Sequence, residues 1–188
     1  MLPRMSNPEL ILFRSFQAKS ARYLEFGCGG STVLASADAK EWIVAVDSSE
    51  EWLQHVAAAC ATAPTAPELV FADIGKIGDW GYPVDPAARP RWAGYHSDVF
   101  QTLPKSRDAD FIMVDGRFRV ACFAQAILHC PATALIGFHD FKSRPQYHIV
   151  RELGREIATM EDMSVFAPLE GARERAIQIL DAFRENPA

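Results

Sequence analysis

Four acidic residues lie at or near the ends of predicted strands: Glu25, Asp47, Asp73 and Asp115. The carboxyl ends of parallel strands meet at one edge of a sheet, and open α/β proteins bind ligands at that edge. Asp47 has the spacing at which an acidic residue accepts ribose hydroxyls in nucleotide-binding βαβ units, although it can also cap the following helix. Because chance placement at successive strand ends is the poorer explanation, the pattern predicts a ligand site.

A glycine-rich turn joins the first predicted strand to the next helix, in the run from Glu25 to Thr32. Glycines there allow positive φ and let a ligand approach the backbone closely. The helix that follows offers free amide groups to a polar or negative group. The alternative is a turn that serves chain geometry alone, and the acidic residues on the neighbouring strands favour binding.

A second polar group follows the fourth and fifth predicted strands and consists of Asp115, His139 and Asp140. A histidine titrates near neutral pH and suits a general base. Two carboxylates supply oxygen ligands for a hard divalent cation. The structural alternative is that His139 and Asp140 cap their strand end. We expect an active-site role for the three residues and assign no metal to them.

Strand-like and helix-like segments alternate along the chain, which is typical of a parallel sheet covered on both faces by helices. The predicted strands cover residues 22–26, 42–46, 69–71, 111–114, 134–138 and 164–167. The predicted helices begin at about residue 7 and then cover residues 31–39, 49–61, 117–129 and 147–158. Residues 174–183 fit either a strand or a helix by periodicity alone.

An irregular insertion is predicted over residues 74–97, because this stretch lacks a regular apolar period. It carries an unusual number of aromatic side chains: Trp80, Tyr82, Trp92, Tyr95 and His96. Such a loop can form a lid over a pocket. It can equally form a small core of its own or an oligomer contact.

The composition describes one soluble domain over residues 1–188, with 49% hydrophobic residues and a net charge of -5. This charge argues against nucleic-acid binding, which needs a basic surface. The four cysteines show no Cys-x-x-Cys spacing, so we expect reduced thiols and a cytoplasmic location. No apolar run is long enough to span a membrane. The expected partner is a small-molecule substrate, and a homo-oligomer is left open.

The ordered motifs resemble those of the class I S-adenosylmethionine-dependent methyltransferases, especially the small-molecule O-methyltransferase-like group. The first motif is Tyr23–Thr32, and the resemblance continues through residues 45–48, 71–74, 110–116 and 136–141. It implies an α/β fold with a Rossmann-like, doubly wound sheet of seven strands, mostly parallel, with helices on both faces. The family's last strand is antiparallel, and we place it at Glu174–Leu180.

The resemblance also implies that S-adenosylmethionine is the cofactor. In that family Gly27 and Gly29 line its methionine part, Asp47 accepts both ribose hydroxyls, and Asp73 faces the adenine amino group. Glu25 lies nearby, and Ser31 replaces the third glycine of the motif. The expected cofactor-binding residues are therefore Glu25, Gly27, Gly29, Ser31, Asp47 and Asp73.

The chain departs from its relatives after Asp115-Gly116. Arg117 and Arg119 occupy a segment where many relatives carry an acidic residue and a histidine, and this argues against a divalent cation. The two arginines form a solvated helix face, or a guanidinium fork for a carboxylate or phosphate of the substrate. Positive charge at a helix N-terminus is unfavourable by itself, which supports the second interpretation.

The predicted reaction is methyl transfer to a small molecule, with neutral His139 as the base for an acceptor hydroxyl and Asp115 or Asp140 orienting it. One alternative is a cofactor-binding protein of the same fold without methyltransferase activity. Another is a nicotinamide-dependent oxidoreductase. Thr32 stands where the dinucleotide fingerprint has its last glycine, which counts against that enzyme.

Overall fold

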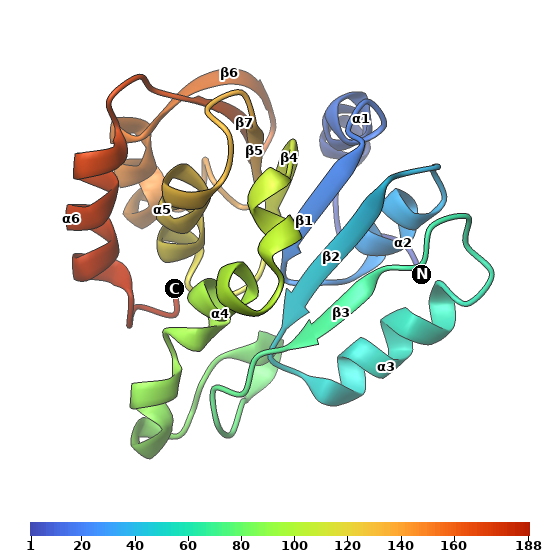
Figure 1. Ribbon diagram of the computed structural model, residues 1–188, viewed down its shortest axis with the longest axis horizontal. Coiled ribbons are helices and arrows are strands. Elements are labelled where there is room, and N and C mark those ends of the chain that lie inside the picture. Colours follow the sequence, from blue (N-terminus) through green and yellow to red (C-terminus); the bar gives the residue numbers. More distant parts are fainter.

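The computed structural model describes residues 1–188, and its core is one seven-stranded sheet in the order β3-β2-β1-β4-β5-β7-β6 (Figure 1). Neighbouring strands from β3 to β5 are parallel, whereas β7 is antiparallel to both β5 and β6. The strands are β1 (Arg22–Phe26), β2 (Trp42–Asp47), β3 (Glu68–Phe71), β4 (Phe111–Val114), β5 (Leu135–Phe138), β6 (Gly154–Met160) and β7 (Met163–Pro168).

Helices cover both faces of the sheet (Figure 1). They are α1 (Asn7–Gln17), α2 (Gly30–Ser36), α3 (Glu50–Ala59), α4 (Gly94–Thr102), α5 (Arg119–His129) and α6 (Arg173–Phe183). Short 3₁₀ helices cover Asp79–Gly81, Pro86–Arg91, Pro104–Asp108 and Pro145–Glu152. None of these helices combines the length and the apolar character needed to cross a membrane.

Alternate side chains of β1 enter two different cores, as the period of a strand requires. Leu24 and Phe26 join a 30-residue cluster with buried side chains of α4, α5 and α6. Tyr23 points to the other face and packs edge-on against Phe13 of α1, with ring centroids 6.3 Å apart. The doubly wound α/β architecture expected from the sequence is therefore confirmed, and so is its antiparallel last strand.

The location of that last strand was predicted wrongly. Glu174–Leu180 belongs to helix α6, because Ala176 and Ile179 are buried on one helical face. The antiparallel strand is β7, which overlaps the short strand predicted at 164–167. The helix predicted over 147–158 is also wrong. A 3₁₀ helix ends at Glu152, and β6 then pairs with β7 as a hairpin.

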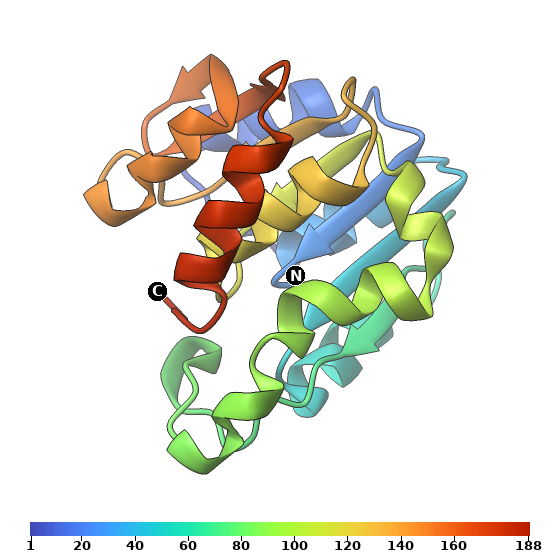
Figure 2. The ribbon, with the colours of Figure 1, turned by 60° about the vertical axis from the view of Figure 1, so that its left-hand side comes forward.

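The insertion projects from the carboxyl edge of the sheet (Figure 2), and regular structure resumes earlier than predicted, at Gly94. Its aromatic residues divide into two groups. Tyr95 and His96 are buried in the first turn of α4, whereas Trp80 and Tyr82 are exposed at the tip. The core interpretation therefore holds for the end of the segment, and only the tip remains available as a lid or contact surface.

Candidate functional site

The strand-end residues share one edge of the sheet, as the parallel arrangement predicted. Asp47 ends β2, Asp115 follows β4, and His139 follows β5. Strand β1 lies between β2 and β4, and β5 pairs with β4 on the other side. The glycine turn that follows β1 therefore lies between Asp47 and the pair Asp115 and His139.

Two glycines of the turn have different roles, because Gly27 lies where no side chain fits and Gly29 faces open space. Gly27 has φ +94°, and a Cβ there would lie 2.4 Å from Cα of Gly116. The turns after β1 and β4 thus pack backbone against backbone. A Cβ at Gly29 would meet nothing closer than the indole of Trp52 at 4.0 Å. Trp52 Nε1 donates to the carbonyl of Cys28 at 2.7 Å, so the indole forms one wall of this space.

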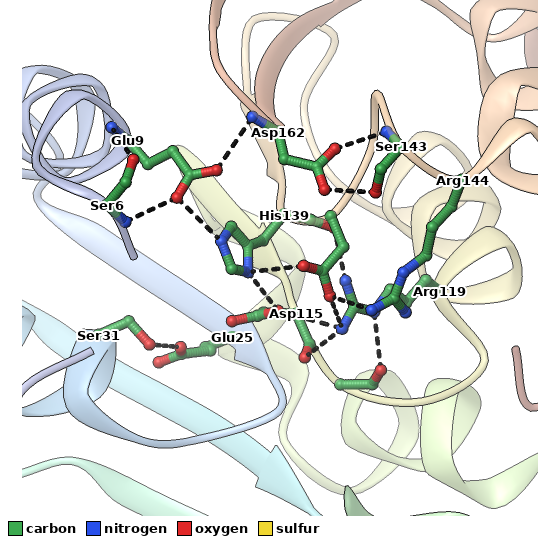
Figure 3. Close-up of polar contacts among 12 residues, drawn as sticks. Ser6, Glu9, Glu25, Ser31, Asp115, Arg119, His139, Ser143, Arg144 and Asp162 are labelled. Atoms are coloured by element: carbon green, nitrogen blue, oxygen red, sulfur yellow. Dashed lines mark hydrogen bonds and ion pairs between the residues drawn. The ribbon is translucent and has the colours of Figure 1, made fainter. Parts of the chain in front are cut away.

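Glu25 and Ser31 are buried at the glycine turn and joined by a hydrogen bond (Figure 3). The Glu25 carboxyl is fully buried and accepts hydrogen bonds from the hydroxyls of Ser31 and of Thr32, the latter at 2.6 Å. Burial raises the pKa of Glu25 to about 8. These groups tie β1 to the start of α2 and support the turn, and their contact with a cofactor stays a prediction.

The two other expected nucleotide contacts differ in how far the protein itself occupies them. Asp47 Oδ1 accepts from the backbone N–H of Ser49 at 3.0 Å, and Ser48 and Cys28 also lie against the carboxylate. Burial raises the pKa of Asp47. Asp73 is already engaged, because it accepts from Gly75 N at 3.0 Å and forms an ion pair with Arg91. Asp47 therefore forms no ion pair, whereas Asp73 is paired with Arg91 and anchors the insertion.

A hollow of about 520 Å³ lies beside Asp73. Its lining combines apolar residues of the sheet with polar residues of the insertion and α4, among them Val46, Val70, Asp73, Arg91, Ser97 and Asp98. The Asp73–Arg91 ion pair thus forms part of the polar lining.

The N-terminal segment lies against the glycine turn. A Cβ on Gly30 would be 2.1 Å from the backbone nitrogen of Pro3 and 2.2 Å from the carbonyl carbon of Leu2. Two residues later, the guanidinium of Arg4 lies 4.4 Å from the ring centroid of Trp80. The segment therefore connects the glycine turn with the exposed tip of the insertion.

His139 is buried among three carboxylates (Figure 3). Its Nδ1 is 3.0 Å from Asp115 Oδ1 and 3.7 Å from Asp140 Oδ1, and its Nε2 is 3.6 Å from Glu9 Oε2. Burial alone would lower the pKa of His139, but the hydrogen bond and charge of Asp115, with Asp140 and Glu9, raise it to about 9. The imidazole is thus protonated at neutral pH, unlike the neutral base expected from the sequence.

Arg119 connects the ends of β4 and β5 from the first turn of α5. Its side chain is 3% exposed. It donates to the carbonyls of Gly116 at 2.9 Å, His139 at 2.5 Å and Asp115 at 3.1 Å. Its Nη2 is also 3.2 Å from Asp115 Oδ1 and 3.1 Å from Asp140 Oδ2. Both sequence interpretations of Arg119 are therefore wrong, because it is neither solvated nor free for a substrate.

The three potential metal ligands lie together, since ligand atoms of Asp115, His139 and Asp140 are within 4.8 Å of one another. The charge that they would offer to a cation is already neutralised, because Arg119 bridges the two carboxylates and His139 is protonated. Arg144 adds a further ion pair to Asp140 at 2.8 Å. These residues do not fit a divalent cation.

Asp115 has one carboxylate oxygen that forms no hydrogen bond or ion pair within the protein. Its Oδ1 contacts both His139 and Arg119, whereas its Oδ2 has no hydrogen bond in the protein. Burial would raise the pKa of Asp115, but the charge of Arg119 and the hydrogen bond from His139 hold it below its usual range. Asp115 is therefore a charged acceptor with a fixed orientation.

Two residues of this site, Glu9 and Arg144, were not found from the sequence. Glu9 contacts His139 from α1 and also accepts from the N–H of Asp162 at 3.0 Å. Its one sequence signal is the capping box with Ser6, in which Ser6 N donates to Glu9 at 2.8 Å. The Arg119 network carried no signal, because its partners come from separate strand ends.

Comparison with known proteins identifies the architecture. No family model and no curated protein matches the chain. Among solved structures, a methyltransferase-like protein from Silicibacter pomeroyi is 27% identical, with a TM-score of 0.84 over 98% of this chain and 97% of that one. A hypothetical protein from Thermus thermophilus is 15% identical, with a TM-score of 0.50 over 90% and 92%.

An O-methyltransferase from Bacillus cereus is more distant, at 16% identity and a TM-score of 0.48 over 96% of this chain and 71% of that one. The strand order, together with the likeness to the Silicibacter protein, defines the class I methyltransferase fold. The chain has this fold over nearly its full length, and the resemblance of its motifs is confirmed at the level of architecture.

Proposed function

We propose that this chain is an S-adenosylmethionine-dependent methyltransferase acting on a small molecule. The observation that carries the proposal is that Asp47, which forms no ion pair, and the open space at Gly29 both lie at the carboxyl edge of a methyltransferase fold. Asp47 would hold the ribose hydroxyls, and the backbone at Gly27 and Gly29 would face the methionine part.

When bound, S-adenosylmethionine supplies an electrophilic methyl group on a sulfonium. The protein must then hold an acceptor in line with that methyl group. Asp115 Oδ2 can accept a hydrogen bond from an acceptor hydroxyl. The methyl group would pass from sulfur to the acceptor oxygen as the C–S bond breaks, with S-adenosylhomocysteine as the leaving group, and the Asp115 carboxylate would take the acidified hydroxyl proton. His139 and Arg119 are positioning residues in this proposal, because both hold Asp115 Oδ1.

Calorimetry with S-adenosylhomocysteine tests the cofactor assignment. We expect binding of this compound and no comparable binding of NAD. Asp47→Ala removes the acceptor for the ribose and leaves polar groups unpaired, so the binding free energy should weaken by about 1–3 kcal/mol. Asp181→Ala, a change of the same type on the exposed face of α6, should have no effect. Equal affinity of the Asp47→Ala variant and the wild type would refute the ribose assignment.

A second candidate is a cofactor-binding protein of this fold without transfer activity. The observation that favours it is that both ring nitrogens of His139 face carboxylates, which leaves the edge without a neutral base. Incubation with radiolabelled S-adenosylmethionine and a broad panel of phenols, amines and thiols separates the two. Transfer to any acceptor supports the enzyme, whereas tight cofactor binding with no transfer across the panel supports the second candidate.

A further inference from the structure

Arg117 is the arginine at this edge that lacks an anionic partner. Arg119 and Arg144 both pair with carboxylates, whereas Arg117 forms no ion pair and its side chain donates no hydrogen bond. Its Nε is buried and unsatisfied. A partly buried guanidinium without a partner has lost hydration and gained no interaction in return, which costs free energy.

The surroundings of Arg117 make this cost larger. Burial, and next the charge of Arg119, lower the pKa of the Arg117 guanidinium. The residue also precedes the N-terminal end of α5, where positive charge is unfavourable. Its backbone N–H donates to the Tyr95 hydroxyl at 3.2 Å, so the main chain at this position is fixed.

The backbone on either side of the site is strained. Phe118 has φ +54° and Asp140 has φ +55°, both in the left-handed region that non-glycine residues rarely adopt. Such strain costs of order 1–3 kcal/mol per residue and clusters at functional sites. Phe118 follows Arg117 in the loop after β4, and Asp140 lies just beyond the end of β5.

The position of Arg117 relates it to the tip of the insertion and to Asp115. Its Cγ would lie 4.0 Å from a Cβ at Gly81, so its side chain runs beneath the turn that carries Trp80 and Tyr82. Its charge also contributes to the lowered pKa of Asp115. Arg117 is two residues from Asp115 in the loop after β4, so an anion on Arg117 would be bound near the carboxylate that receives the acceptor hydroxyl.

We infer that Arg117 binds an anionic group of the methyl acceptor, either a carboxylate or a phosphate, and so selects acidic acceptors. The inference rests on the proposed function. A guanidinium binds both groups through two parallel N–H···O bonds, which fixes orientation as well as charge. The acceptor would then be a small acid whose hydroxyl lies toward Asp115, beneath the tip of the insertion.

Anion titration of the protein saturated with S-adenosylhomocysteine tests the inference. Acetate and methyl phosphate serve as separate probes, and binding is followed by calorimetry or by NMR shifts. We expect one of them to bind, and Arg117→Gln to weaken its affinity at least about tenfold, the loss of one charge-assisted contact. Arg14→Gln removes the same charge from an exposed position of α1 and should leave the affinity unchanged.

The probes also distinguish the two chemistries, since stronger binding of acetate indicates a carboxylate and stronger binding of methyl phosphate a phosphate. Failure of the wild-type protein to bind either probe, or equal binding by Arg117→Gln, overturns the inference. S-adenosylhomocysteine binding is measured first, so that a failure of the proposed function is seen separately. If this compound does not bind, the same anion titrations are carried out on the cofactor-free protein and still compare the wild type with Arg117→Gln. If Arg117→Gln fails to fold, Arg117→Lys keeps the charge without the fork and should bind the probe more weakly.

Discussion

At the scale of single residues, Arg119 holds the site together. It contacts three backbone carbonyls and two carboxylates from a nearly buried position. A lysine there would keep the charge but lose the planar fork that reaches several acceptors at once. A neutral residue would leave the carboxylates of Asp115 and Asp140 close together with less compensation. The network therefore depends on guanidinium geometry as well as on charge.

We predict that Arg119→Gln lowers the free energy of unfolding by about 3–5 kcal/mol, the range for breaking a buried ion pair. Arg119→Lys should lose less, and the exposed Arg14→Gln should lose almost nothing. Urea unfolding at neutral pH measures all three.

EDTA should leave the stability and any methyl transfer of the wild type unchanged, because Arg119 bridges the two carboxylates that a cation would need. A loss of stability or activity on chelation, restored by magnesium, would contradict this assignment.

The sequence identified residues of this edge better than it identified their roles. Asp47, Asp115 and His139 were placed correctly at strand ends, because the register of a parallel sheet follows from short apolar runs. The protonation of His139 could not be predicted in the same way. It depends first on Asp115 and then on Asp140 and Glu9, and Asp115 and Glu9 are brought to the imidazole from β4 and α1 only by the fold.

At the scale of elements, the first five strands were predictable because each is a short apolar run between turn residues. The C-terminal region was not. Residues 154–160 contain Glu156 and other polar residues, since β6 lies at the edge of the sheet and needs no continuous apolar run. In α6, the spacing of Ala176, Ile179 and Leu180 fits a helix, but a strand was preferred from the family resemblance.

The N-terminal segment provides a test of element packing. Gly30→Ala places a methyl group within about 2.1 Å of the backbone of Pro3, so the segment must move away from the turn. We predict faster tryptic cleavage after Arg4, measured by mass spectrometry, with little change in global stability. Gly29→Ala is the matched control, because a Cβ there has 4.0 Å of free space. Cleavage at the same rate in both variants would show that the segment does not pack on Gly30.

At the scale of the whole molecule, several carboxylates and three histidines have shifted pKa values, and these shifts determine how stability depends on pH. Burial lowers the pKa values of His96 and His129, so both histidines favour the folded state less as the pH falls. The folded pKa values of Glu9, Asp115, Glu156 and Asp162 lie below their usual range. These carboxylates stabilise the protein at a pH above their pKa values in the unfolded chain. This stabilisation is lost as the pH falls through their pKa values in the folded protein. The protein should therefore lose stability in acid.

The shifts of His139 and Glu25 act in the opposite direction and set the alkaline limit. In the folded protein the pKa of His139 is raised to about 9 and that of Glu25 to about 8. At a pH above the pKa that each group has in the unfolded chain, the folded protein therefore binds more protons than the unfolded chain does. The contribution of His139 is complete below its unfolded pKa, near 6.5, and is lost as the pH rises through about 9. That shift corresponds to at most about 3 kcal/mol.

We therefore predict that the free energy of unfolding is greatest between about pH 5 and 6.5 and falls by a few kcal/mol toward pH 9. Urea unfolding across this range measures the curve. His139→Asn should be less stable than the wild type at pH 6 and should approach it at pH 9, because the wild type then loses its imidazolium. Glu25→Gln cannot ionise, so the free energy of unfolding of this variant should fall less steeply than that of the wild type as the pH rises. A wild-type curve that stays level from pH 6 to pH 9 would rule out both assignments, since each requires protons to be released on unfolding in that range.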